Sequence, residues 1–166
     1  VGSEMCIRDS RGAAPIHHTI LNDDPVTGLT LIRMDEGMDT GPVVLQEEMA
    51  VLKDETFGSL YERLSQKSGD LVVNFLRGAA GLKVDEQPQD DSKASYAPKP
   101  DQGSSPVNWS ESAKNISCLV RALDPRPGAW TLLNGERMKL FSSRVFDQEY
   151  SSGCPGRVHL EPKGLF

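Results

Sequence analysis

Residues 28–45, with the sequence GLTLIRMDEGMDTGPVVL, constrain the fold more than any other stretch of the chain. Two short apolar runs, 29–32 and 43–45, have the length and the β-branched residues that are typical of strands. Between them lies an acidic corner that contains Gly37 and Gly41, where the backbone can adopt conformations that other residues resist. The stretch therefore predicts two buried strands joined by a glycine-bracketed acidic loop.

Three carboxylates lie in this loop: Asp35, Glu36 and Asp39. If the flanking strands partly exclude water from Asp39, its carboxylate has the usual setting of a general base. An acidic turn without chemistry is the alternative that spacing alone favours, because short motifs often match by chance. A divalent-metal loop is a weaker alternative, since no His or Cys pair stands nearby and the acids do not follow an EF-hand pattern.

The chain has 166 residues, enough for one large domain or for a domain with a smaller partner. No run approaches the roughly 20 apolar residues that span a bilayer, so we expect no membrane partner. Three widely spaced cysteines argue against a disulfide framework and a structural zinc site, and they favour a reducing, cytoplasmic setting. The net charge is −6, with −8 on residues 1–108 and +2 on residues 109–166, a weak signal for phosphate binding by the C-terminal part.

Helical spacing of apolar residues predicts three helices. The first begins at Pro15, and the second follows a cap at Asp54 or Thr56 and ends near Gly78 and Gly81. Gly69 lies inside the second pattern and predicts a local break. The third helix follows a cap at Ser110, and its expected buried residues are Ala113, Ile116, Leu119, Val120 and Leu123. His17 and His18 are expected to be surface or rim residues, because adjacent helical residues point about 100° apart.

Residues 85–106 are rich in Pro, Ser, Asp and Gln, which predicts an extended, solvated linker. Asn134-Gly135 between apolar runs predicts a hairpin of 131–133 with 137–141. Further short strands are expected at 143–146 and 156–160. A helix followed by short strands is compatible with a small β-barrel of the OB type.

The segments RGAAPI, TGLTLIR, MDEGMDTGPVV, SYAPK, VNWS and RALDPRPGAWT together resemble the tetrahydrofolate-dependent formyltransferases over residues 11–166. The resemblance implies an α/β chain with three parts. These are the C-terminal half of a Rossmann-like formyltransferase domain (11–84), a linker (85–108) and an incomplete OB-like barrel domain (109–166). Residues 1–10 do not resemble the family and look like a translated adapter tag, so we expect them to be foreign to the family's sequence.

The family transfers a formyl group from 10-formyltetrahydrofolate to an amine, and an Asn, a His and an Asp share the chemistry. The Asp matches Asp39, and the resemblance places Arg11, Gly12, Asp35 and Gly37 beside the folate, with no metal. Residues 1–10 stand where the family carries its Asn and His. We therefore expect the isolated chain to behave as an inactive, poorly folded fragment, because losing one oxyanion donor alone costs about 10²–10³ in rate.

Within the family, YAPK, VNWS and DPRPGAWTLLNG fit best the members that formylate the amino group of initiator methionyl-tRNA for translation initiation. This resemblance implies a protein of the bacterial or organellar cytoplasm that is monomeric at full length. Lys99, Arg121 and Arg126 are the expected tRNA contacts. Two alternatives stay open: a formyltransferase that acts on sugar-nucleotide amines, and a non-catalytic RNA-binding module in residues 109–166.

Overall fold

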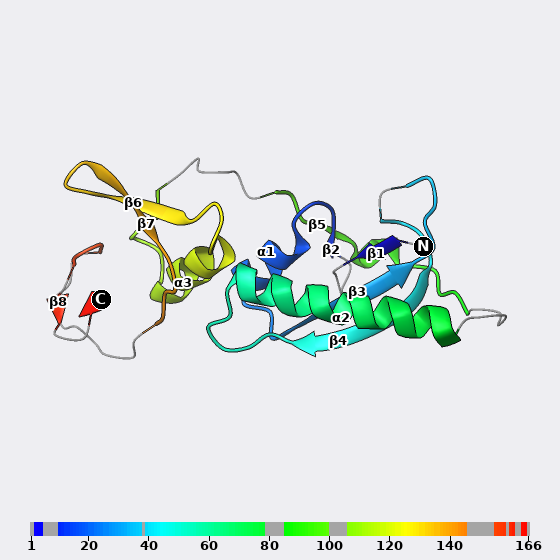
Figure 1. The fold of residues 1–166 in the computed structure, drawn as a ribbon. Helices are drawn as coiled ribbons and strands as arrows, with labels where there is room; N and C mark the ends of the chain where they lie inside the picture. Colours follow the sequence, from blue (N-terminus) through cyan, green and yellow to red (C-terminus); the bar gives the residue numbers. More distant parts are fainter. Residues whose placement is uncertain are drawn as a thin grey trace.

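The computed structural model describes residues 2–4, 10–37, 39–78, 85–99, 106–145, 155–158, 160–161 and 164–165. The molecule is elongated, as Figure 1 shows, with a helix-covered sheet toward one end and a helix with a β-hairpin toward the other. The described part combines helices with small sheets, as the α/β prediction requires.

The largest sheet has the order β1-β3-β4, and both of its strand pairs are antiparallel. The central strand β3 (Val26–Ile32) pairs along its whole length with β4 (Val43–Ala50), so both predicted strands are confirmed and both are longer than expected. The prediction that both are buried holds only for β3. Strand β4 is half-buried to exposed, because it forms the edge of the sheet and carries polar residues after Leu45.

The backbone of β1 (Gly2–Glu4) lies on the other side of β3, opposite Thr30–Ile32. Within residues 1–10, the described backbone therefore contributes β1 and, with Ser10, the start of β2 (Ser10–Arg11). Strand pairing requires only backbone N–H and C=O groups, so a segment that lacks the family's side-chain pattern can still complete a sheet.

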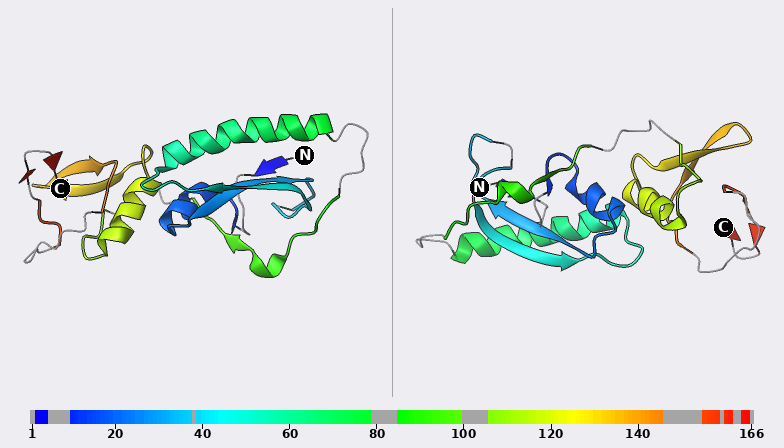
Figure 2. Two further views of the ribbon diagram at one scale, coloured as in Figure 1. Left: turned by 90° about the horizontal axis from the view of Figure 1, so that it is seen from below. Right: turned by 180° about the vertical axis from the view of Figure 1, so that it is seen from behind.

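The long helix α2 (Phe57–Gly78) runs along one face of this sheet (Figure 2). Its Leu60 and Leu64 are fully buried with Leu29 and Leu31 of β3 in one apolar core. Thr56 caps the helix, as predicted: its Oγ1 accepts a hydrogen bond from the backbone N–H of Ser59 at 3.3 Å, and the Ser59 hydroxyl accepts one from Thr56 N–H at 3.1 Å.

The predicted break at Gly69 is wrong, because α2 continues through it without interruption. A Cβ at Gly69 would meet no atom within 4 Å, so this glycine lies on the open face of the helix. The predicted helix end is confirmed at Gly78, whereas Gly81 lies outside the described residues.

Helix α1 (Pro15–Leu21), which has Pro15 in its first turn, contacts α3 (Ala113–Ala122). The cap of α3 is Ser112 rather than Ser110, because the Ser112 hydroxyl accepts from Asn115 N–H at 3.1 Å. Only Val120 of the expected stripe is fully buried. The helix packs on two sides, toward α1 and toward the hairpin, and this buries a wider set: Ser117, Cys118, Val120, Arg121 and Ala122.

Strands β6 (Ala129–Leu133) and β7 (Glu136–Leu140) form the predicted hairpin, and both turn residues have positive φ, +52° at Asn134 and +86° at Gly135. No strand covers residues 143–145, so that prediction is wrong where it can be compared; residues 146 and 159 lie outside the described ranges. The expected strand at 156–160 is reduced to β8 (Leu160–Glu161), which pairs with β9 (Gly164–Leu165). These described strands form two separate pairs, so an OB-like barrel is not shown.

The segment 85–99 is extended, as predicted, but it is attached to the first part of the molecule. It contains the short 3₁₀ helix η1 (Asp91–Lys93) and β5 (Ser95–Tyr96), which pairs in parallel with β2. Gln87 exchanges two backbone hydrogen bonds with Val43 at 2.7 and 2.8 Å. In Figure 2 this segment passes on the side of the sheet opposite α2.

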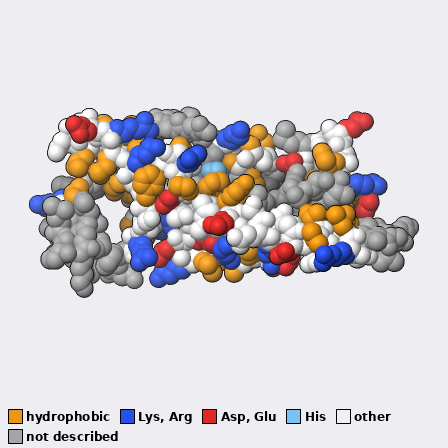
Figure 3. Space-filling model, in the orientation of Figure 1, with side chains coloured by type: hydrophobic (Ala, Val, Ile, Leu, Met, Phe, Trp, Pro, Cys, Tyr) orange, Lys and Arg blue, Asp and Glu red, His pale blue; other side chains and the backbone are white. Residues whose placement is uncertain are grey.

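On the face shown in Figure 3, acidic and basic side chains are intermingled rather than gathered into patches of one sign. None of the helices in the described ranges combines the length and the apolar character needed to cross a bilayer.

We predict opposite effects for Gly→Ala substitutions at two positions. In Gly41→Ala the new Cβ would overlap the Arg33 carbonyl oxygen, and overpacking of this kind lowers the free energy of unfolding by about 1–3 kcal/mol. Gly69→Ala, in the open face of α2, should raise it by roughly 0.5–1 kcal/mol. Urea unfolding measures both values, and equal effects at the two positions would contradict this account of the corner.

Candidate active site

Asp39 lies in the corner between β3 and β4 with an unusual backbone conformation, φ +61°. Its Oδ2 accepts a hydrogen bond from the backbone N–H of Gly12 at 2.9 Å, and the residue is half-buried. No hydrogen bond to Oδ1 occurs within the described part of the chain. A carboxylate with one oxygen anchored by a backbone amide and the other open has a fixed orientation and a free position for a proton.

Gly12 fits this contact because it has no side chain. Its φ is +115°, which L-residues rarely adopt. An added Cβ would lie 2.9 Å from the ring of Tyr96 and 3.1 Å from the carbonyl oxygen of Ala97. The close approach of segment 85–99 therefore requires glycine at the position whose amide meets Asp39.

Asp35 organises the exposed tip of the same loop. Its Oδ1 accepts hydrogen bonds from Gly37 N–H at 3.0 Å and from the Thr40 hydroxyl at 2.7 Å. At the base of the loop, Arg33 N–H donates to the Pro42 carbonyl at 3.0 Å. Asp35 and Gly37 thus shape the loop, and their exposure leaves this surface open beside Asp39.

Arg11 joins the site from β2. Its Nη2 donates to Asp91 Oδ1 at 2.7 Å and to Gln89 Oε1 at 3.2 Å. The structure therefore brings Gly12 to Asp39 directly, and Arg11 to the same loop through Gln89.

Gln89 is the site residue that sequence reasoning missed. Its Nε2 donates to the backbone carbonyls of Asp39 at 2.9 Å and Gly41 at 2.6 Å. A single polar residue in a polar stretch carries no periodic signal, so nothing in the sequence pattern distinguishes Gln89 from its neighbours.

The three expected tRNA contacts differ in their exposure. Lys99 and Arg126 are exposed, whereas the Arg121 residue is only 7% exposed. The Arg121 guanidinium donates to the backbone carbonyl of Glu55 and to Asp23 Oδ1, both at 3.2 Å. The Arg121 guanidinium is therefore bound by groups within the molecule. This arrangement favours a structural role over an RNA contact.

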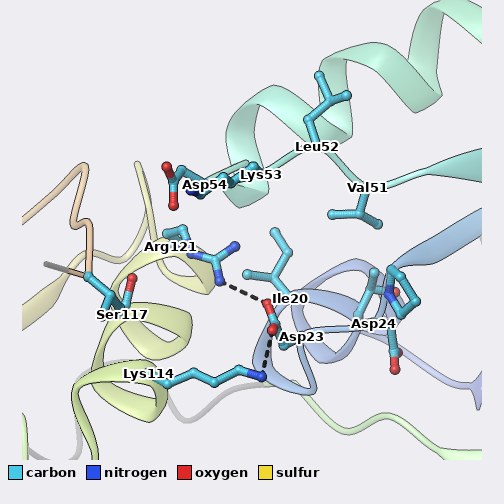
Figure 4. Close-up of a pocket in the computed structure, with 13 residues that line it drawn as sticks. Ile20, Asp23, Asp24, Val51, Leu52, Lys53, Asp54, Lys114, Ser117 and Arg121 are labelled. Carbon is cyan, nitrogen blue, oxygen red and sulfur yellow. Dashed lines mark hydrogen bonds and ion pairs between the residues drawn. The ribbon is translucent and has the colours of Figure 1, made fainter. Parts of the chain in front are cut away.

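A cavity of about 420 Å³ lies beside Arg121, between α1, α3 and the loop from β4 to α2 (Figure 4). In this view Asp23 faces both Arg121 and Lys114, and its Oδ2 lies 2.9 Å from Lys114 Nζ. Asp39 does not line this cavity. The cavity and the carboxylate site are therefore separate features.

The two neighbouring histidines have different partners, as expected from their position on α1. The ring of His17 stacks on Phe57 with 3.9 Å between centroids, and burial lowers the pKa of His17. His18 Nε2 lies 3.1 Å from the Pro98 carbonyl oxygen. Among the described residues, no three His, Cys, Asp or Glu side chains are grouped so that they could hold a metal ion.

Two family models match the chain: "Formyl transferase" over residues 9–76, which includes Arg11, Gly12 and Asp39, and "Formyl transferase, C-terminal domain" over residues 101–166. The chain therefore belongs to the formyl transferase family, and its Rossmann-like α/β fold is that of the family.

The curated relatives that the chain matches include proteins named methionyl-tRNA formyltransferase from several bacteria. The protein from Syntrophus aciditrophicus is 40% identical over 156 residues, which are 93% of this chain and 50% of the relative. The protein from Roseobacter denitrificans is 41% identical over 152 residues, 92% of this chain and 48% of the relative. The chain thus spans about half the length of the relatives that it matches.

Two solved structures are similar to this chain in fold. HypX from Aquifex aeolicus in complex with tetrahydrofolic acid has a TM-score of 0.74 and 23% identity, covering 94% of this chain and 27% of that chain. The N-formyltransferase from Helicobacter canadensis, in complex with folinic acid and dTDP-3-aminofucose, has a TM-score of 0.78 and 16% identity. It covers 98% of this chain and 60% of that chain.

We predict that the Asp23 contact stabilises the protein in a pH-dependent way. Lys114, with a smaller contribution from Arg121, holds the pKa of the Asp23 carboxyl below its ordinary value. The stabilisation is therefore complete above the unfolded-state pKa of about 3.9 and is lost as the pH falls through the lower folded-state pKa. Asp23→Asn should lower the urea midpoint at pH 7, and the difference from wild type should shrink in acid.

Asp24→Asn is the matched control, because the side chain of Asp24 has no ion pair within the described ranges. This variant should keep the wild-type midpoint at both pH values. A difference between Asp23→Asn and wild type that stays constant from neutral to acid pH would contradict the prediction.

Proposed function

We propose that the chain serves formyl transfer from 10-formyltetrahydrofolate to the amino group of initiator methionyl-tRNA. The observation that carries the proposal is the Asp39 carboxylate, held at 2.9 Å by the Gly12 amide within the segment that matches the formyl transferase model. The acceptor is supported by relatives at about 40% identity that are named methionyl-tRNA formyltransferases.

The reaction requires a neutral amine. Its nitrogen attacks the formyl carbon, a tetrahedral oxyanion forms, and the bond between that carbon and the folate nitrogen breaks. The amine loses a proton during the transfer, and the leaving folate nitrogen gains one. Asp39 suits this proton movement, because its orientation is fixed through Oδ2 while Oδ1 faces no partner within the described chain.

The folate substrate is proposed to lie along the exposed side of the corner loop. Asp35 and Gly37 present backbone and carboxylate groups there, and Asp39 lies in the same loop. The Arg11 side chain is only 17% exposed and is paired with Asp91. We therefore propose that Arg11 stabilises the site and does not offer an unpaired charge to the folate. The tetrahydrofolic acid bound to HypX supports this ligand class.

The finer organisation is also proposed. Residues 11–84 form the catalytic part, 85–108 the linker, and 109–166 a domain of OB-like type to which the β6–β7 hairpin belongs. Lys99 and Arg126, both exposed, are the proposed tRNA contacts. The protein at full length is proposed to act as a monomer in the bacterial or organellar cytoplasm, and its relatives named above are bacterial.

A sugar-nucleotide acceptor is the second candidate, because the Helicobacter canadensis neighbour was solved with dTDP-3-aminofucose. That neighbour is only 16% identical to this chain, whereas the relatives named for methionyl-tRNA are at about 40%. The sequence relation therefore favours the tRNA acceptor.

A chimera tests the proposal directly. This chain replaces the segment that it matches in the Syntrophus aciditrophicus relative, and formylation of methionyl-tRNA and of dTDP-3-aminofucose is measured. We expect activity on methionyl-tRNA and a loss of about 10²–10⁴-fold in Asp39→Asn, the range that general acid–base groups contribute. Glu48→Gln, at an exposed position of β4 away from the corner, should keep the parental rate.

Formylation of dTDP-3-aminofucose without formylation of methionyl-tRNA would show that the acceptor is an amino sugar. A chimera that binds tRNA but transfers no formyl group would favour the RNA-binding module instead. Full activity of Asp39→Asn would remove Asp39 from the chemistry.

A further inference from the structure

We propose that Gln89 is a positioning residue for Asp39, an inference that rests on the proposed function for the role of that carboxylate. Gln89 lies outside the corner loop, in the segment that the sequence indicates to be a solvated linker. Its side-chain amide nevertheless connects the loop of Asp39 to Arg11.

The chemistry of the contacts requires an amide. The carbonyls of Asp39 and Gly41 only accept hydrogen bonds, and they occupy the two N–H groups of Gln89 Nε2 at 2.9 and 2.6 Å. The guanidinium of Arg11 only donates, and it meets Oε1 at 3.2 Å. Glutamate has the same shape but lacks both donors, so it cannot hold the two carbonyls.

The loop needs an anchor from outside. Asp39 has a left-handed conformation, which is unfavourable for a residue with a Cβ and persists where surrounding contacts hold it. Gly12 fixes the carboxylate end of Asp39, and Gln89 fixes its backbone carbonyl. With both ends held, the direction in which the open carboxylate oxygen points is set.

Gln89 also holds the strand that carries Gly12, whose amide binds the Asp39 carboxylate. Arg11 directly precedes Gly12, so the contact of Gln89 with Arg11 steadies the strand that delivers the Gly12 amide. Around Gln89, the segment is bound to the first part of the molecule on both sides. Gln87 pairs with Val43, and Ala97 N–H donates to the Arg11 carbonyl at 2.8 Å. The side chain of Gln89 therefore extends from a backbone that is held in place on both sides.

The test measures the Gly12 amide by NMR in the 166-residue chain during a pH titration. Because Gly12 N–H donates to Asp39, its resonance should shift as the Asp39 carboxylate gains a proton in wild type. We expect Gln89→Glu to lose this shift. Gln87→Glu adds the same charge at an exposed position that pairs through its backbone, and it should retain the shift.

Gln89→Asn is the second variant. It adds no charge and keeps the amide, but its reach is one methylene shorter, so it should also lose the shift. It decides the test if Gln89→Glu no longer gives the spectrum of a folded chain. A role of Gln89 in overall stability alone would lower the urea midpoint and leave the titration of Gly12 unchanged.

Retention of the Gly12 shift in both Gln89 variants overturns the proposal, and so does its loss in Gln87→Glu. The outcome is independent of formyl transfer: a chimera without activity would contradict the proposed function, whereas the titration would still report whether Gln89 positions Asp39.

Discussion

The hydrogen bond between the Gly12 amide and the Asp39 carboxylate joins two parts of the site that lie 27 residues apart in the sequence. It depends on a left-handed Asp39, on a glycine that tolerates the approach of Tyr96, and on a loop closed between Arg33 and Pro42. Each of these features concerns the conformation or the contacts of the backbone. The geometry of the site therefore depends on backbone conformations that only particular residues can adopt.

The buried strand β3 gives this loop a rigid base. Leu29 and Leu31 pack beneath α2, so the strand that leads into the corner cannot shift without disturbing the core. The segment 85–99 then closes the loop from the other side. A carboxylate in this setting is oriented before any substrate binds, which the proposed transfer through a tetrahedral intermediate would require of its proton-handling group.

The parts of the fold that could be predicted are those with a local chemical signature. A short apolar, partly β-branched run predicts β3, the 3.6-residue spacing predicts α2, and Asn134-Gly135 predicts the hairpin turn. Gln89 and Arg121 could not be placed in the same way. The position of Gln89 depends on backbone carbonyls about 50 residues earlier in the chain, and the burial of Arg121 depends on the packing of α3 against α1. Contacts of this kind leave no periodic pattern, so an arginine that the sequence presents as a candidate RNA contact becomes a buried partner of Asp23.

Hydrogen exchange at the backbone amides of Gly12, Val43 and Gln87 tests the central claim most directly. All three amides donate to fixed acceptors that tie the corner loop to its surroundings. The account predicts that all three exchange more slowly than the same amides in an unfolded chain. Exchange of Gly12 at the unfolded rate, with Val43 and Gln87 unprotected as well, would show that the loop is not held and would contradict the proposed site.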